Sequence, residues 1–331
     1  MKAAFIDKFG APEGIRFDEF PTPVVGDSDV LVSVAAVTVN PIDTYIRAGA
    51  FDAAVPLPFI IGRDMTGVVE AVGRHVTSFR RGDRVWANNQ GYHGRQGTFA
   101  EFCCVQEELL YRLPPEADLR DSVAVVHSGL TALLGLRLRA AINPGETIFI
   151  NGGDGNVGSA VLQFAKAAGA RAIVTSAHHE KAAWSRELGA DLVINYRKDD
   201  VVRTVLDFCP GGVDVYWDAS ATPDATRALE MTARRARLVF MAGLKHRTTL
   251  PVGAFYSKNL TLYGFTATDA TTEELSVCAD EINRALQART LRPRIAARLP
   301  LSSAAEAHHL IENTTQFGKI VLLPDPGEIA A

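Results

Sequence analysis

The stretch TIFINGGDGNVGSAVLQFAKAAG, residues 147–169, decides the fold. It begins with a short run typical of a buried strand, passes through a glycine-rich turn, and continues with apolar residues at helical spacing. Gly153, Gly155 and Gly158 fit the spacing GxGxxG, which indicates dinucleotide binding when it follows a strand and opens a helix. Glycines there let backbone N–H groups and the helix N-terminus approach a pyrophosphate. We therefore predict that Gly153, Gly155, Val157 and Gly158 hold a dinucleotide; the alternative is a glycine-rich turn that binds nothing.

The same alternation of strand and helix continues after this turn. Further strands are predicted at 171–175, 192–195, 213–217, 237–242 and 260–265, with helices at 156–168, 179–188, 199–208 and 223–233. Repeated in this way, the pattern predicts an α/β fold with a doubly wound parallel sheet. Before it, runs at 29–39, 67–72 and 83–87 predict a β-rich domain, followed by a helix over 121–141. The tail predicts helices near 271–288 and 302–313 and strands near 294–300 and 319–323.

Composition excludes several classes of protein. The chain has 331 residues, 47% of them hydrophobic and 22% charged, which are ordinary values for a globular protein and exclude extensive disorder. The net charge of −4 argues against nucleic acid as the main partner, and no apolar run approaches the roughly 20 residues of a membrane helix. The first residues, MKAAFIDKFG, carry charges where a signal peptide has its apolar core. With four cysteines and no CxxC spacing, we expect a cytoplasmic protein without a disulfide framework.

The strand at 171–175 bears on the choice of dinucleotide. An Asp or Glu after it would hold the ribose 2′-hydroxyl of NAD, but the chain continues with Ser176, His178 and Lys181. Small hydroxyls and a lysine suit a 2′-phosphate, so we predict NADPH in preference to NADH. Asp154 puts a carboxylate inside the glycine turn, and its side chain is expected to point away from the phosphates.

The chain resembles the zinc-independent quinone oxidoreductases of the medium-chain dehydrogenase/reductase superfamily, the branch that contains zeta-crystallin. The resemblance lies in VTVNPIDTYIRAG (37–49), LPFIIGRDMTGVVEAVG (57–73), GTFAEF (97–102), HSGLTAL (127–133), INPGETIFINGGDGNVG (142–158), EKAAWSRELGADLVINYR (180–197) and GKIVLL (318–323). It implies a GroES-like β domain made of residues 1–122 and 292–331, with a Rossmann domain over 123–291 that binds NADPH.

The resemblance also implies a site without a metal. Zinc-dependent relatives carry a Cys ligand in the place of Asn40 and a His-Glu pair in the place of Arg63-Asp64, so no catalytic zinc is expected. In the family, the residues corresponding to Asn40 and Tyr45 lie beside nicotinamide and substrate, and both are carried over here as catalytic candidates. The Tyr45 hydroxyl would donate a proton or hydrogen bond to the developing oxyanion, unless Tyr45 merely packs in the cleft. Asn40 would position the nicotinamide or order its own loop.

Further contacts are implied in the same way. The cofactor would be bound by the resembling positions Asn40, Thr131, Ser176, Lys181, Tyr196, Gly243, Phe265 and Lys319. Of these, Lys181, Tyr196 and Lys319 would surround the 2′-phosphate, and a Cβ at Gly243 would crowd the dinucleotide. An apolar substrate pocket would be formed by Ile42, Tyr45, Ile60, Tyr92 and Phe255. Arg63 would favour an anionic acceptor if it faced the cleft, and would have no such role if it faced solvent.

The expected function is NADPH-dependent reduction of a small-molecule quinone. The first alternative is reduction of an activated C=C bond in an enal, enone or enoyl thioester; the second is a nucleotide-binding protein with a structural or sensory role. Relatives pair their sheets through the last strand, here 260–265, and an exposed apolar edge strand is a hazard. A homodimer or homotetramer is therefore expected.

Overall fold

The chain divides into two compact units. The structure, a computed structural model, describes residues 1–51, 53–313 and 316–324. Unit 1 comprises Met1–His127 and Leu275–Ala331, and unit 2 comprises Ser128–Glu274. Both boundaries fall inside helices, α2 (Val123–Leu133) and α8 (Thr272–Gln287). Most of α8 thus belongs to unit 1, whereas the sequence predicts a boundary after residue 291.

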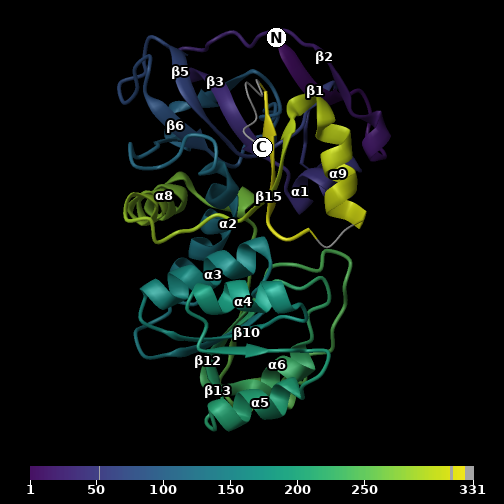
Figure 1. The fold of residues 1–331 in the computed structure, drawn as a ribbon, viewed down its shortest axis with the longest axis vertical. Coiled ribbons are helices and arrows are strands. Elements are labelled where there is room, and N and C mark those ends of the chain that lie inside the picture. Colours follow the sequence, from purple (N-terminus) through teal and green to yellow (C-terminus); the bar gives the residue numbers. More distant parts are fainter. Residues whose placement is uncertain (52, 314–315, 325–331) are drawn as a thin grey trace. The chain divides into compact units, whose positions relative to one another are not determined.

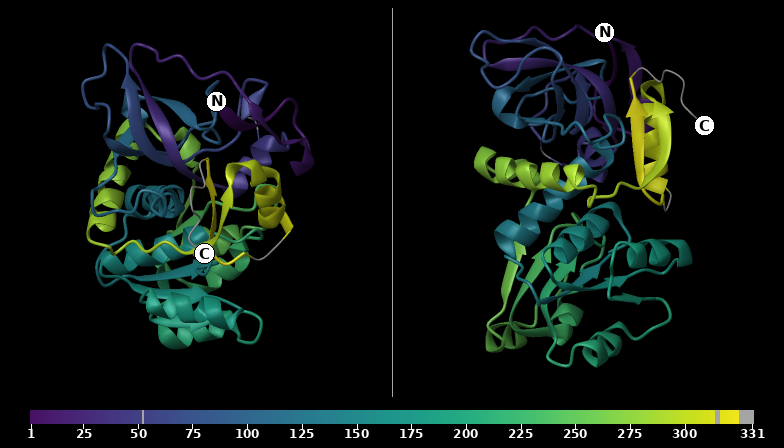
Figure 2. Two further views of the ribbon diagram at one scale, coloured as in Figure 1. Left: turned by 45° about the horizontal axis from the view of Figure 1, so that its top comes forward. Right: turned by 60° about the vertical axis from the view of Figure 1, so that its left-hand side comes forward.

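Unit 2 is built on a six-stranded parallel sheet, with helices on both faces (Figures 1 and 2). The strand order is β11-β10-β9-β12-β13-β14, so the connections reverse direction next to β9. Ligands of such sheets bind at the carboxyl ends of the strands where this reversal occurs. The strands are β9 (Thr147–Asn151), β10 (Arg171–Thr175), β11 (Leu192–Ile194), β12 (Val213–Asp218), β13 (Thr232–Phe240) and β14 (Thr261–Gly264). The helices are α3 (Asn156–Ala167), α4 (His179–Glu187), α5 (Val201–Phe208), α6 (Ala225–Met231) and α7 (Val252–Ser257).

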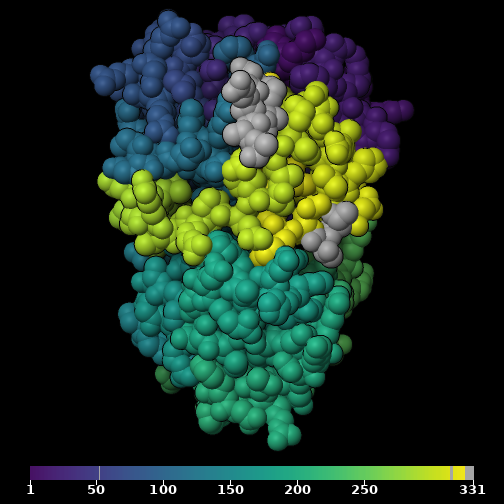
Figure 3. Space-filling model, viewed as in Figure 1, coloured from purple at the N-terminus to yellow at the C-terminus, as the bar shows by residue number. Residues whose placement is uncertain are grey.

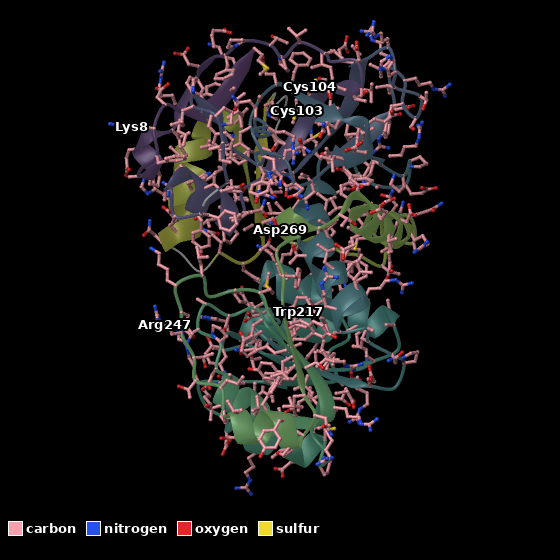
Figure 4. All side chains as sticks on the ribbon, turned by 180° about the vertical axis from the view of Figure 1, so that it is seen from behind. Lys8, Cys103, Cys104, Trp217, Arg247 and Asp269 are labelled. Carbon is pink, nitrogen blue, oxygen red and sulfur yellow. The ribbon has the colours of Figure 1, made fainter. Side chains whose placement is uncertain are left out.

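The apolar runs of these strands form the core of unit 2. All five residues of β9 are buried, as expected for a central strand covered on both faces. The Phe149 ring stacks on Tyr216 of β12 with 5.2 Å between ring centroids. Trp217, labelled in Figure 4, is fully buried and packs edge-on against Phe265. The predicted doubly wound α/β fold is confirmed.

Unit 1 is a β domain completed by the C-terminal part of the chain. One sheet has the order β2-β1-β4, and the other has the order β15-β16-β3-β5-β6-β8, with β7 also paired to β3. β16 runs antiparallel to β3, so the tail strand pairs with a strand from the first forty residues. The strands are β1 (Lys2–Ile6), β2 (Arg16–Glu19), β3 (Asp29–Thr38), β4 (Phe59–Ile60), β5 (Met65–Val72), β6 (Arg84–Ala87), β7 (Phe102–Gln106), β8 (Leu110–Arg112), β15 (Ile295–Pro300) and β16 (Lys319–Leu323).

Two further helices belong to unit 1. They are α1 (Pro41–Arg47), which follows β3, and α9 (Ala304–Asn313), which precedes β16 and is drawn in yellow in Figure 1. In the space-filling view, α9 lies at the surface of unit 1 (Figure 3). The cysteines of β7, Cys103 and Cys104, are both free thiols (Figure 4). No helix among the residues that the structure describes is both long and apolar enough to span a membrane.

The predicted helix over 121–141 has a different form. α2 ends at Leu133, and Leu134–Arg139 continue as a π-helix. Gly135 lies at this change, where an added Cβ would be 2.2 Å from the Trp217 ring and 2.9 Å from the Phe265 ring. Since no side chain fits there, the glycine lets the π-helix pack directly on these two aromatic residues.

Candidate active site

The glycine turn after β9 has the form that dinucleotide binding requires. Gly158 packs against the turn itself, since an added Cβ would lie 2.1 Å from the Gly152 carbonyl oxygen. Gly153 packs against β10, with only 2.6 Å between its ideal Cβ position and Val174 Cβ. The nearest atom to a Cβ on Gly155 is the Gly152 oxygen at 3.3 Å, and Gly155 is exposed. Gly153 and Gly158 thus shape the turn, while Gly155 leaves the outer side of the turn open to a ligand.

The helix that follows supplies the hydrogen-bond donors. Gly155 caps α3, and its carbonyl accepts the first helical hydrogen bond from Ser159 at 2.8 Å. The first N–H groups of a helix have no partner within it and attract anions. An open glycine followed by these donors fits the pyrophosphate of a dinucleotide. Gly153, Gly155, Val157 and Gly158 all lie in this turn or in the first turn of α3, and Val157 is half-buried.

A buried polar network fixes the strand ends beneath the turn. Asp218, at the end of β12, accepts hydrogen bonds from Asn151 Nδ2 at 3.1 Å and from the Tyr216 hydroxyl at 3.1 Å. Thr175 Oγ1 donates to Asn151 Oδ1 at 3.1 Å and accepts the Gly152 N–H at 3.0 Å. The network therefore ties the ends of β9, β10 and β12 to the first glycine of the turn. Sequence reasoning missed these residues; a polar residue at the end of β9, of β10 and of β12 was the available signal.

Asp154 contacts the residue that follows β10. Its Oδ2 atom accepts a hydrogen bond from the Ser176 hydroxyl at 2.6 Å, and Ser176 is buried. The carboxylate therefore points along the turn toward the end of β10. His178 and His179 are exposed at the start of α4, and Lys181 is half-buried within it.

The other residues expected at the cofactor differ in accessibility. Thr131 is buried in α2, and Tyr196 is exposed after β11. Gly243 has φ +82°, and an added Cβ would lie 2.7 Å from Pro223 and 3.0 Å from the Ala221 carbonyl oxygen. The chain itself therefore requires this glycine, whether or not a dinucleotide is bound. Phe265 packs edge-on against Trp217 with 6.2 Å between ring centroids.

In unit 1, the start of α1 is held by a buried polar cluster. The Asp64 carboxylate accepts hydrogen bonds from the Thr38 backbone N–H at 2.9 Å, from the Thr38 hydroxyl at 2.6 Å and from Asn40 Nδ2 at 3.1 Å. The Asp43 carboxylate accepts the Asn40 backbone N–H at 2.7 Å, and Lys319 Nζ donates to Asn40 Oδ1. Asn40 is fully buried, so its amide serves this cluster.

Burial controls the ionisation of this cluster. It raises the pKa of the Asp43 carboxyl to about 7, and the charge of Asp64 acts in the same direction. Burial also raises the pKa of Asp64, against the opposing effects of the Lys319 ammonium and the Thr38 hydrogen bonds. The pKa of Lys319 and that of Arg63 are both lowered by burial, and Asp43 and Asp64 oppose each shift. Two carboxyl groups and two basic groups thus share one buried region.

Lys319 and Arg63 belong to this region. The sequence places Lys319 at the 2′-phosphate; the structure instead buries its ammonium against Asn40, where Asp64 also stabilises it. That prediction needs correction, because a phosphate-binding cation must be accessible to its ligand. Arg63 is also buried; it donates to Asn89 Oδ1 and lies 5.9 Å from the centre of the Tyr92 ring.

The other end of α1 is also tied to the tail. Arg47 Nη2 pairs with Glu312 of α9, while Lys319 of β16 contacts Asn40 at the start of the same helix. α1 is therefore held at both ends by residues from the last twenty described positions. On the helix so held, the Tyr45 side chain is 40% exposed and Ile42 is half-buried.

The remaining residues predicted to line a substrate pocket do not all face open space. Ile60 is buried in β4, where it pairs with Phe5 of β1. Phe255 of α7 packs on the apolar core of unit 2. Tyr92 is half-buried, with its ring beside Arg63. Tyr45, Ile42, Tyr92 and Phe255 thus remain accessible in part, whereas Ile60 serves packing alone.

A buried ammonium lies beside Asn40 and Asp64, which stand where the resemblance puts the metal ligands of zinc-dependent relatives. Asn40 and Asp64 bond to each other and face Lys319. Within residues 1–51, 53–313 and 316–324, no three His, Cys, Asp or Glu side chains gather in a way that could hold a metal ion.

Comparisons with known proteins agree with this architecture. Residues 26–115 match the alcohol dehydrogenase GroES-like domain, and residues 156–283 match the family described as zinc-binding dehydrogenase. The chain is 32% identical to a quinone oxidoreductase of Pseudomonas aeruginosa, covering 96% of this chain and 97% of the relative. It is 31% identical to the quinone oxidoreductase of Sus scrofa, covering 98% of each.

Two further likenesses bear on the chemistry. A chloroplastic NADPH-dependent alkenal/one oxidoreductase of Arabidopsis thaliana is 29% identical, over 98% of this chain and 80% of the relative. The structure of Escherichia coli quinone oxidoreductase complexed with NADPH superimposes with a TM-score of 0.87 at 27% identity, over 98% of this chain and 100% of that one. The glycine turn, the two-unit architecture and these matches along nearly the whole chain lead to one conclusion. The chain belongs to the medium-chain dehydrogenase/reductase superfamily, in its zeta-crystallin-like quinone oxidoreductase branch.

Proposed function

We propose that the chain is a zinc-independent reductase that takes hydride from NADPH and delivers it to a quinone. The observation that carries the proposal is the turn at 152–158, where an open Gly155 is followed by the N-terminus of α3. This arrangement fits a dinucleotide pyrophosphate. A bound reduced nicotinamide supplies the hydride, and the protein supplies binding, orientation and electrostatics.

NADPH is the donor favoured by the groups around the end of β10. No acid follows the strand directly, and Ser176, His178 and Lys181 stand in the segment that would face the adenosine ribose. Tyr196 is exposed after the neighbouring strand β11 and is retained as a contact. The relative solved with NADPH supports the same donor. Lys319 is omitted from this set because it is buried in unit 1.

Tyr45 is the proposed proton or hydrogen-bond donor to the substrate. Hydride addition to a quinone places negative charge on a carbonyl oxygen, which a donor in place can stabilise. Tyr45 is accessible on α1, whereas the Asn40 amide is used within the buried cluster. Asn40 is therefore proposed as a positioning residue, which fixes the first turn of α1 so that Tyr45 is presented.

The Lys319 ammonium supports chemistry without zinc. A divalent cation bound between Asn40 and Asp64 would lie beside this buried positive charge, and like charges at short distance in a buried site repel strongly. The residues also lack the thiolate and imidazole ligands that catalytic zinc usually takes. Stabilisation of the oxyanion is thus assigned to hydrogen-bond donors of the protein.

Reduction of an activated C=C bond is the second candidate. It uses the same donor and the same oxyanion stabilisation, and the alkenal/one reductase relative favours it. In either case the substrate is a small molecule. The exposed edge strand β14 of unit 2 supports association into a homodimer or homotetramer.

The test is to mix the purified protein with NADPH and 1,4-benzoquinone and to follow absorbance at the nicotinamide band. We expect rapid oxidation, and Tyr45→Phe should lower kcat by about a hundredfold while leaving NADPH affinity unchanged. Tyr256→Phe is the matched control, because Tyr256 is 70% exposed on α7 and outside the proposed site. Binding of NADPH without oxidation of NADPH by benzoquinone would contradict quinone reduction, and oxidation with an enone in its place would establish the second candidate.

A further inference from the structure

We propose that Asp154 is a specificity-determining residue, which supplies from the glycine turn the ribose-binding carboxylate that β10 lacks. The inference rests on the proposed function, because it concerns the adenosine end of the same dinucleotide site. Its consequence is that the chain accepts NADH as well as NADPH. Without Asp154, the groups after β10 would select NADPH alone.

Ser176 stands at the position where dinucleotide-binding sheets usually carry the ribose-binding acid. In dinucleotide-binding sheets, the acid that holds the ribose 2′-hydroxyl follows the second strand, about 20 residues after the glycine motif. In this chain the second strand is β10, and Ser176 is the residue that follows it. A serine hydroxyl carries no charge, so the residue at this position cannot by itself exclude a 2′-phosphate.

Ser176 is in direct contact with Asp154 of the glycine turn. The two residues are 22 positions apart in the sequence, yet the Ser176 hydroxyl donates to Asp154 Oδ2 at 2.6 Å. The same hydroxyl also lies 3.3 Å from the His178 carbonyl oxygen, but its single hydrogen favours the shorter contact with Asp154, which orients the carboxylate toward the end of β10. The negative charge therefore lies at the ribose end of the turn.

The Asp154 carboxylate can accept a further hydrogen bond. An ionised carboxylate has two oxygens and about four acceptor positions, so the bond from Ser176 leaves capacity for a ribose hydroxyl. The 2′-hydroxyl of NADH would be such a donor. The 2′-phosphate of NADPH cannot donate when ionised, and its charge has the same sign as that of Asp154.

Basic groups in the same segment act in the opposite direction. Lys181 lies in α4, and His178 directly precedes that helix. Lys181 would attract a 2′-phosphate, as a protonated His178 would. The opposing charges make the selectivity of the site a balance, in which Asp154 offsets the basic groups and leaves both dinucleotides as ligands.

Fluorescence titration with NADH and with NADPH measures this balance without turnover. We expect wild-type dissociation constants within about tenfold of each other. Asp154→Asn keeps the size and the hydrogen bond from Ser176 but removes the charge. It should shift the affinity ratio toward NADPH by about tenfold or more. Displacement by adenosine 2′,5′-bisphosphate should tighten in this variant, and displacement by 5′-AMP should not.

Glu230→Gln is the matched control, because Glu230 is an exposed acid of α6 in the same unit and its loss changes the net charge equally. The ratio should be unchanged in this control. Asp154→Ser, which also removes the charge, serves if Asp154→Asn folds poorly. A wild type that binds both dinucleotides, with a ratio that neither substitution changes, overturns the inference alone. A wild type that binds neither overturns the proposed function and the inference with it.

Discussion

Asp43, Asp64, Lys319 and Arg63 place four ionisable side chains in the interior of unit 1. Isolated charges in such surroundings would cost several kcal/mol each, so their mutual interactions and the hydrogen bonds from Thr38 and Asn40 must offset much of that cost. The cluster fixes the junction of β3 and α1, because Thr38 ends the strand and Asn40 precedes the helix. Stability at this junction therefore depends on protonation.

The raised pKa of Asp43 determines whether stability rises or falls with pH. Its pKa is raised to about 7 by burial and by Asp64, so the folded state binds a proton at Asp43 more tightly than the unfolded state does. The stabilisation that follows is complete below the unfolded pKa and is lost as the pH rises through about 7. Relative to Asp43→Asn, the free energy of unfolding of the wild type should fall by about 2 kcal/mol between about pH 5 and about pH 8. Urea denaturation of both proteins across this range measures the difference.

Asp207→Asn is a suitable control for Asp43→Asn, because Asp207 is exposed on α5 and pairs with the exposed Arg203. It should leave the pH dependence of stability unchanged. If the difference between wild type and Asp43→Asn were constant across the pH range, Asp43 would not be the titrating group.

At this scale, sequence reasoning found the residues of the cluster but not their partners. Asn40, Arg63 and Asp64 stand at positions that the family resemblance singles out. Lys319 lies 279 positions from Asn40, and nothing in the local sequence around either residue indicates their contact. Asp154 is predicted to point away from the phosphates, but the hydroxyl that orients it belongs to Ser176, which follows β10 and lies 22 positions away in the sequence.

Among the elements, β9, the glycine turn and α3 form the unit whose geometry follows most directly from sequence. Gly158 and Gly155 have different structural roles in the turn. Gly158 allows close packing, since a Cβ would lie 2.1 Å from the Gly152 oxygen, whereas a Cβ on Gly155 would be 3.3 Å from the same atom. Replacement of each by alanine separates stability from binding.

Gly158→Ala should lower the free energy of unfolding by about 2 kcal/mol or more, because α3 must shift away from the turn. Gly155→Ala should change it by less than about 1 kcal/mol, yet weaken NADPH binding by about tenfold, because the new methyl group lies on the ligand side. Urea denaturation and fluorescence titration of the two variants are the measurements. Equal losses of stability in both variants would contradict the assignment of Gly158 to packing and of Gly155 to binding.

Other elements depend on contacts that periodicity does not encode. The spacing of apolar residues over 121–141 predicts one continuous helix, but the π-helix at Leu134–Arg139 is associated with packing of Gly135 on Trp217 and Phe265. Those aromatic residues are far along the chain from Gly135. β9, β10 and β12 were predicted well because each is a short, almost fully buried run with its own turn signals.

At the scale of the whole molecule, the sheet of unit 2 ends in an edge strand of unusual character. β14 pairs with β13 on one side, and Leu262 is 39% exposed along it. Edge strands of this kind are normally covered or carry a charge. The association proposed for this protein would cover it.

Leu262→Lys should prevent that association, because a charge on the edge strand opposes pairing with a second copy. Sedimentation equilibrium should show a dimer or tetramer for the wild type and a monomer for the variant. Val277→Lys is the control, since Val277 is 45% exposed on α8, in unit 1. A monomeric wild type, or a variant that associates as the wild type does, would contradict an interface at β14.

The attachment of both ends of α1 to the tail has a consequence for biosynthesis. Unit 2 is one uninterrupted segment, so the ribosome delivers all of it before the tail exists. The first part of unit 1 precedes unit 2 but lacks Glu312, Lys319 and the strand β16 until the ribosome has passed unit 2. Domains fold as units when their residues are available. Unit 2 can therefore fold on the ribosome, while the helix that carries Tyr45 remains without its partners until the residues that follow unit 2 emerge.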